Sequence, residues 1–171
     1  PFDLGVGFRP GTRWGPKSIR DMSVRFGSLG SSGSGYWDLR TRTTRGQASL
    51  VDVGDVEMVP LDWQQNFERI TAAVREIRTR KSLPFILGGD HAITFPNVRA
   101  FDDHKAITVV HFDAHFDYRD EVAGVRYGHG NVLRRVRELP FVDQIVSIGV
   151  RSLRTRCEDF DDFERDGNVC L

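Results

Sequence analysis

The stretch VVHFDAHFD, residues 109–117, decides how this sequence folds. Residues 107–110 form a short, apolar and β-branched run, which is typical of a buried strand. Every second side chain then becomes polar, in the order His111, Asp113, His115 and Asp117. Unpaired charges at the end of a buried strand are costly, so the pattern predicts that something bound there compensates them.

Length and composition set the class of protein. The chain has 171 residues, of which 39% are hydrophobic, and 24 basic residues balance 24 acidic ones. These values suit one domain with a hydrophobic core over residues 1–171. Zero net charge gives no electrostatic reason to expect a nucleic-acid or membrane partner. We also find no apolar run near the ~20 residues of a transmembrane helix.

Two cysteines, Cys157 and Cys170, stand in no metal-binding or redox spacing. We expect free thiols and therefore a reducing, cytoplasmic compartment. The chain opens in an apparent strand with no signal peptide before it. Because the natural N-terminus is expected to lie upstream, an organellar location stays open.

Apolar periodicity predicts an alternation of strands and helices. We expect strands at residues 1–7, 50–56, 84–87, 107–110 and 144–150, and a further one starting at 168–171. We expect helices at residues 17–26, 61–81, 94–100, 131–138 and 154–165, and a flexible Gly/Ser loop at 27–35. This order predicts an α/β fold with a mostly parallel sheet covered by helices. In such a fold, ligands bind at the carboxyl ends of the strands, so we expect the functional site there.

The polar residues after two of these strands suit a metal site. Asp113, His115 and Asp117 alternate in extended chain and can converge on one point. His91 follows Gly88 and Gly89, which permit a tight turn towards the same place. Carboxylates with imidazoles favour a divalent ion such as Mn²⁺, although ligand type alone does not separate Mn²⁺ from Ni²⁺. Four ligands with two bridging-capable carboxylates indicate two ions.

Simpler interpretations stand beside this one. The D-x-H-x-D pattern alone could be a helix cap with surface ion pairs. His111 has the parity of the cluster but lies deeper in the strand, so we interpret it as a core residue or as one that orients a ligand. The acidic run EDFDDFERD, residues 158–166, is interpreted as a solvated helix face.

The order of four motifs resembles the ureohydrolase superfamily of arginases and agmatinases. They are GGDH at 88–91, HFDAHFD at 111–117, HG at 129–130 and VSIGVRS at 146–152. The opening PFDLGVGFRPGTRWGPKSIR is similar to the start of agmatinase-like members. The resemblance implies a three-layer α/β/α sandwich with a binuclear Mn²⁺ site that hydrolyses a guanidino or related amidine group.

By position, the resemblance implies roles for five residues. His91 and Asp117 would hold one ion, His115 the other, and Asp113 would bridge them. His129 matches a histidine that shuttles protons to the leaving amine. The implied mechanism is attack of a metal-bridging hydroxide on the guanidinium carbon, releasing urea and an amine. Among the activities of this superfamily, we expect the hydrolysis of agmatine to putrescine. The resemblance also implies homo-oligomers such as trimers or hexamers.

One family motif is missing. A later D-x-D strand, which supplies two further metal ligands, is not found before Leu171. The resemblance therefore implies that this is the N-terminal portion of a ureohydrolase fold, incomplete at its C-terminus and inactive alone. The alternative is a non-catalytic subunit with an incomplete metal site.

Substrate choice should depend on the loop before His129. Asp120 or Glu121 could pair with the distal ammonium of agmatine. Arg119 or Arg126 could instead pair with a carboxylate, as in guanidinobutyrate or formiminoglutamate. The four charges could also simply pair with one another in solvent. Agmatine is the narrow preference.

Overall fold

The structure is a computed structural model that describes residues 1–25, 35–45 and 50–171. The predicted flexible loop at 27–35 lies, apart from its last residue, outside the described residues. The α-helices are α1 (Gly15–Ser23), α2 (Trp63–Thr79), α3 (Thr94–Arg99), α4 (Val132–Arg137) and α5 (Cys157–Arg165). The strands are β1 (Tyr36–Asp38), β2 (Thr43–Arg45), β3 (Ile107–Phe112), β4 (Val142–Ile148) and β5 (Val169–Cys170).

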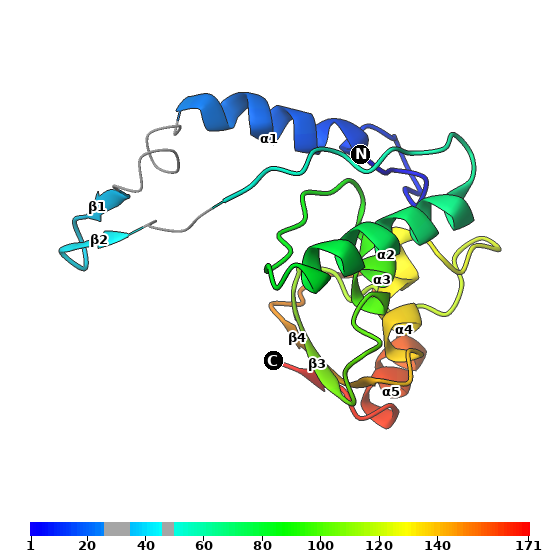
Figure 1. The fold of residues 1–171 in the computed structure, drawn as a ribbon. Helices are drawn as coiled ribbons and strands as arrows, with labels where there is room; N and C mark the ends of the chain where they lie inside the picture. The colour runs from blue at the N-terminus through cyan, green and yellow to red at the C-terminus, as the bar shows by residue number, and fades with distance from the viewer. Residues whose placement is uncertain (26–34, 46–49) are drawn as a thin grey trace.

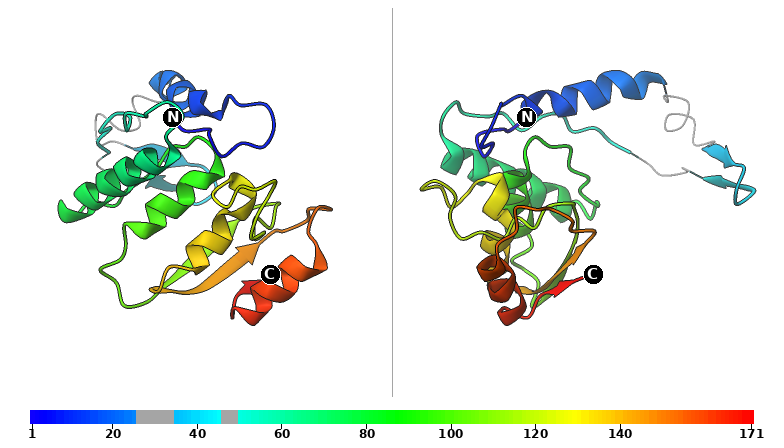
Figure 2. Two further views of the ribbon diagram at one scale, coloured as in Figure 1. Left: turned by 90° about the vertical axis from the view of Figure 1, so that its right-hand side faces the viewer. Right: turned by 180° about the vertical axis from the view of Figure 1, so that it is seen from behind.

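A parallel sheet of order β3-β4-β5 forms the centre of the fold. Helix α4 connects β3 to β4 and α5 connects β4 to β5, so both crossovers are helical. Figures 1 and 2 show these helices beside the sheet, while α1 and the antiparallel β1–β2 hairpin extend away from this body. The predicted α/β class with a parallel sheet is confirmed.

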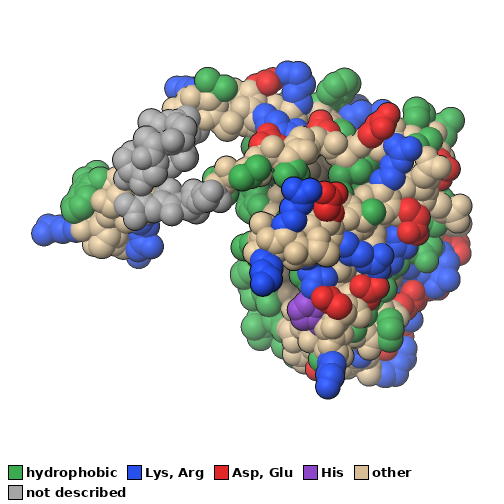
Figure 3. All heavy atoms as spheres, viewed as in Figure 1, with side chains coloured by type: hydrophobic (Ala, Val, Ile, Leu, Met, Phe, Trp, Pro, Cys, Tyr) green, Lys and Arg blue, Asp and Glu red, His purple; other side chains and the backbone are tan. Residues whose placement is uncertain are grey.

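The core lies between the sheet and the helices. Val132, Leu133 and Val136 of α4 pack with Ile145 of β4 and Phe163 of α5, and all five are buried. On the opposite side of β3, Val110 and Phe112 are 54% and 75% exposed. Over the helical face, acidic and basic side chains are intermingled (Figure 3), as the zero net charge suggests.

Helix α2 confirms the helix predicted at 61–81. Its apolar stripe buries Phe67, Ile70 and Val74, with spacings of three and four. The Asp62 side chain caps the helix by accepting a hydrogen bond of 2.9 Å from the Gln65 amide. The helices predicted at 94–100, 131–138 and 154–165 and the strands at 107–110 and 144–150 also form, with slightly different ends.

Three predicted strands are wrong. Residues 1–7, 50–56 and 84–87 have no assigned ladder with any other described segment. Alternating apolar residues show only what a strand would bury, whereas a strand also needs a partner in register. Residues 50–56 run over the surface, where Asp52 and Asp55 bind Arg20 of α1. The β1–β2 hairpin was not predicted.

The first residues form a docked loop instead of a strand. The buried Asp3 carboxylate accepts hydrogen bonds from the Gly11 amide at 2.8 Å and from Arg13 Nε at 2.7 Å. It also accepts from the Arg13 amide at 3.4 Å. Because one carboxylate satisfies these donors, residues 3–13 close into a loop that carries the intervening residues to the end of the sheet.

We expect Asp3→Asn to destabilise the protein in a pH-dependent way. The Arg13 hydrogen bond lowers the pKa of Asp3 below its usual value. A lowered pKa contributes stability above the unfolded pKa of about 3.9, and that contribution is lost as the pH falls through the folded value. The substitution should cost about 1–2 kcal/mol at neutral pH, since Arg13 is half-exposed and partly screened. Urea unfolding at several pH values measures it.

The control for this prediction is Asp161→Asn, at an exposed position of α5. The difference between wild type and Asp3→Asn should shrink below about pH 4, where the unfolded carboxyl is protonated. A difference that stays constant from neutral to acid pH would contradict the role given to the Asp3 charge.

Candidate metal centre

Strand β3 delivers the central residues of the site. Ile107 and Val109 face the core, and His111 on the same side is 6% exposed. His111 pairs in register with Ser147 of β4, and its Nδ1 lies 3.2 Å from the Ser147 Oγ. Asp113 comes directly after the strand, and its amide donates to the Ile148 carbonyl at 3.2 Å. The side chains beyond β3 are thus fixed by the pairing with β4.

The GGDH motif places His91 opposite this strand end. A Cβ at Gly89 would clash with the Phe2 carbonyl, so only glycine allows this close approach of two backbones. Asp90 caps the 3₁₀ turn η3 (His91–Ile93) by accepting from the Ala92 amide at 2.7 Å. His91 Nδ1 lies 2.9 Å from the Thr94 Oγ1, which fixes the ring with Nε2 towards β3.

Four side chains meet at this point. One donor atom each of His91, His111, Asp113 and Asp117 lies within 4.8 Å of the others. The Nε2 atoms of His91 and His111 are 3.2 Å apart, and their rings stack at 5.2 Å between centroids. The His91 Nε2 is 3.8 Å from Asp117 Oδ2. The turn at Asp117 has a φ of 48°, a left-handed conformation that aspartate tolerates better than most residues.

The pKa values show that these charges are poorly compensated. Burial, followed by the nearby Asp113 charge, raises the pKa of Asp117 to about 6. Burial and the neighbouring His111 lower the pKa of His91 to about 4. Burial also lowers the pKa of His111. The imidazoles are therefore neutral at physiological pH and have lone pairs free to bind a cation.

This donor set fits a divalent cation. Two carboxylates and neutral imidazoles are the ligands that Mn²⁺ and similar borderline ions accept. A cation between them would stabilise the ionised form of Asp117, which burial disfavours. The part of the chain that the structure describes contains no other such group of three or more potential ligands.

The predicted ligands are brought together in part. His91, Asp113 and Asp117 share the cluster, whereas the fourth member is His111 and not His115. The His115 side chain is 65% exposed, and its Nδ1 lies 3.0 Å from Asp113 Oδ1. His115 borders the same open cavity of about 630 Å³ as the other three predicted ligands. The ligand roles therefore stay predictions.

His129 reaches this cavity from η4 (His129–Asn131), the turn before α4. Its Nδ1 lies 2.6 Å from the Gly5 carbonyl oxygen, and its backbone amide donates to the same oxygen at 3.0 Å. The buried Asn131 supports the turn by accepting from the Gly128 amide at 2.7 Å. Gly5, in the N-terminal loop, was not among the predicted site residues.

The four charged loop residues divide into two groups. Arg119 borders the cavity, and its Nη2 donates to the Arg154 carbonyl at 2.8 Å. Asp120 and Arg126 pair with each other at 3.1 Å outside the cavity lining. Glu121 accepts from the Gly124 amide at 3.0 Å, also outside the lining. Asp120 and Arg126 therefore form the ion pair that one interpretation of the loop predicted, whereas Arg119 takes no part in it.

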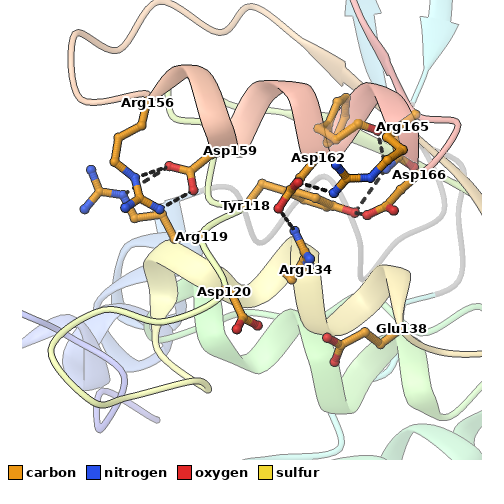
Figure 4. A network of polar contacts seen from close by, with 12 residues as sticks. Tyr118, Arg119, Asp120, Arg134, Glu138, Arg156, Asp159, Asp162, Arg165 and Asp166 are labelled. Atoms are coloured by element: carbon orange, nitrogen blue, oxygen red, sulfur yellow. Dashed lines mark hydrogen bonds and ion pairs between the residues drawn. The ribbon is translucent and has the colours of Figure 1, made fainter.

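Sequence reasoning missed part of the lining of the cavity. Asp159, which we interpreted as part of a solvated helix face, is 5% exposed and borders the cavity. Arg156 binds it through Nε at 2.8 Å, and Arg119 Nε approaches it at 3.5 Å, so that Asp159 lies between two arginines (Figure 4). Arg154 borders the cavity beside them. The spacing of Arg156 and Asp159, three residues apart at a helix start, was the available signal.

Comparison with known proteins shows what the chain is similar to. The Arginase family matches residues 1–169. A mitochondrial guanidino acid hydrolase of Homo sapiens is 34% identical over 164 residues, covering 94% of this chain and 44% of the relative. A mitochondrial agmatinase of Gallus gallus is 34% identical over 155 residues, covering 88% of this chain and 43% of the relative.

Solved structures show the same fold. A formiminoglutamase of Trypanosoma cruzi, solved with Mn²⁺, superposes with a TM-score of 0.83 over 99% of this chain and 56% of its own length. Its sequence identity is 21%, so the likeness concerns the fold. The chain spans about half the length of the relatives it matches. Among the helices of the described residues, none combines the length and apolar character that crossing a membrane requires.

We expect Asp117→Asn to weaken Mn²⁺ binding. The substitution removes one of two charged ligands from a cluster whose imidazoles are neutral. The dissociation constant should rise by at least about tenfold, the lower end of what losing even a supporting group costs a metal site. Titration of the metal-free protein, followed by the electron paramagnetic resonance signal of free Mn²⁺, measures this constant.

The matched control is Asp161→Asn, which should leave Mn²⁺ binding unchanged because Asp161 is exposed on α5. Equal affinity of wild type and Asp117→Asn would place the ion elsewhere. His111→Asn and His115→Asn, titrated in parallel, show which imidazole contributes to the site.

Proposed function

The chain belongs to the arginase family, and from this premise we propose that it forms the N-terminal part of a hydrolase that cleaves a guanidino or amidine C–N bond. The products would be urea, or the corresponding amide, and an amine. The observation that carries the proposal is the cluster of His91, Asp113 and Asp117, which borders the same cavity as His129.

We propose Mn²⁺ as the cofactor, held by His91, Asp113, His115 and Asp117. Support comes from the mixed carboxylate and imidazole donors and from the Mn²⁺ in the structure of the T. cruzi relative. When bound, such ions act as Lewis acids and lower the pKa of a water ligand. Two carboxylates are few for two ions, so we propose that residues 1–171 alone turn over little substrate.

His129 is proposed to carry the proton to the leaving amine. Its ring borders the cavity, and Nδ1 is engaged by the Gly5 carbonyl, which leaves Nε2 to exchange protons with a substrate. An amine leaves more easily when it is protonated as the C–N bond breaks, and a positioned imidazole is a common donor for this transfer.

Support for an acidic substrate tail, rather than agmatine, comes from the charged residues that border the cavity. Asp120 and Glu121, the candidates for binding an ammonium, do not border the cavity. Arg119 and Arg154 do, and the nearby Asp159 carboxylate is already paired with Arg156. A carboxylate would gain charge-assisted hydrogen bonds from this wall, whereas an ammonium would face two like charges. We therefore rank guanidinobutyrate and formiminoglutamate before agmatine.

We also propose that the protein acts as a homo-oligomer in the cytoplasm. Tyr36, Trp37 and Leu39 are 47%, 59% and 84% exposed on the projecting hairpin, where a second copy could cover them. Free Cys157 and Cys170 suit a reducing compartment. Size-exclusion chromatography with light scattering tests the assembly, and a monomer at micromolar concentration would contradict it.

Urea release by the full-length protein loaded with Mn²⁺ tests the function. Agmatine, 4-guanidinobutyrate and formiminoglutamate are compared, the last by its amide product. His129→Ala should lower kcat by about 10²–10⁴-fold with Mn²⁺ retained, as expected for a group that transfers a proton. Mn²⁺ bound without turnover of any of these substrates would favour a non-catalytic subunit.

Arg119→Ala tests the substrate tail. We expect KM for the acidic substrate to rise by roughly 10–100-fold, the cost of about 1.5–3 kcal/mol for a hydrogen bond to a charged group. Arg126→Ala is the matched control, because Arg126 is in the same loop but outside the cavity lining. Turnover of agmatine alone, unaffected by Arg119→Ala, would return the preference to the basic substrate.

A further inference from the structure

Asp90 joins the N-terminal loop to the GGDH motif through both its backbone amide and its side-chain carboxylate. The Asp90 amide donates to the Phe2 carbonyl at 2.8 Å. Its buried carboxylate accepts from the Gly5 amide through Oδ2 at 2.8 Å and from the Ala92 amide through Oδ1 at 2.7 Å. Both carboxylate oxygens are therefore occupied by backbone donors from two separate segments.

Gly5, held by Asp90, in turn contacts His129 through its carbonyl oxygen. Its carbonyl oxygen receives the His129 amide at 3.0 Å and lies 2.6 Å from the ring Nδ1. A carbonyl oxygen can only accept a hydrogen bond, so Nδ1 must carry the proton. In the neutral ring Nε2 is then the unprotonated nitrogen. The contact thereby selects one of the two tautomers of His129.

The surroundings of Gly5 are fitted closely to glycine. A Cβ at this position would lie 2.6 Å from the Ala92 Cβ and 2.8 Å from Asp90 Oδ1, closer than real side chains approach. A Cβ at Gly128 would lie 3.3 Å from the Gly5 oxygen. Two glycines thus allow three backbone segments to meet beside the His129 ring.

We infer that Asp90, acting through Gly5, is a positioning residue that holds His129 as its Nδ1–H tautomer with Nε2 directed at the substrate. The inference deepens the proposed function and rests on it for the catalytic value of His129. The tautomer itself is a property of the protein without substrate. Asp90 would act by placing one carbonyl oxygen, and it exchanges no proton in this account.

The experiment is nitrogen-15 NMR of the full-length protein labelled at histidine, without metal, at about pH 8, above the usual imidazole pKa of about 6.5. The His129 signals are assigned by their loss in His129→Asn. We expect the Nδ1–H pattern in the wild type. Asp90→Ala removes both acceptor oxygens, so the Gly5 amide loses its partner. His129 should then show a mixture of tautomers.

Kinetics and metal content complete the test. Asp90→Ala should lower kcat by on the order of tenfold, a part of the 10²–10⁴ that proton transfer contributes, while bound Mn²⁺ and KM change little. Asp161→Asn, at an exposed position, is the matched control and should leave both the spectrum and kcat unchanged.

An Nε2–H or mixed tautomer of His129 in the wild type would overturn the inference, and this result does not depend on whether Asp90→Ala folds. A wild-type pattern retained in folded Asp90→Ala would overturn the role of Asp90. The expected spectra with no turnover of any guanidino or amidine substrate would instead refute the proposed function. The two failures are therefore distinguishable.

Discussion

The site depends on the alternation of side chains along β3. Parallel pairing with β4 holds Ile107 and Val109 against the helices, and this fixes the side on which His111 lies. A shift of one residue would turn every side chain of the strand to the other face, exposing the apolar residues and removing His111 from His91. Burial of the core therefore determines the register of the cluster.

The cluster stores unfavourable electrostatics that the fold alone does not relieve. The pKa of Asp117 is raised to about 6 and that of His91 lowered to about 4, in both cases mainly by burial. Each shift means that the charged form is less stable in the fold than in water. Such opposed shifts in one cavity are typical of functional sites, because a bound cation reverses the preference of the carboxylates. The burial that destabilises the charged form of Asp117 therefore also makes the cluster suited to binding a cation.

Local pattern accounts for what the sequence could predict. The apolar stripe of α2, the β-branched run of β3 and the polar residues after it are read within one segment, and each of these elements formed. Other features depend on segments that lie far apart in the chain. These are the pairing partners of the strands, the burial of Asp159 and the position of Asp120 outside the cavity lining. The Arg156–Asp159 spacing is the one local signal among them, and spacing within a segment carries no information about the others.

The failed strand at residues 1–7 and the placement of His129 have the same cause. A strand would direct its amides and carbonyls to one neighbour in a regular ladder. The loop instead divides them, so that Phe2 accepts from Asp90 while Gly5 donates to Asp90 and accepts from His129. Backbone groups released from a ladder must still be satisfied where they are buried. Here, satisfying them joins the GGDH turn to His129.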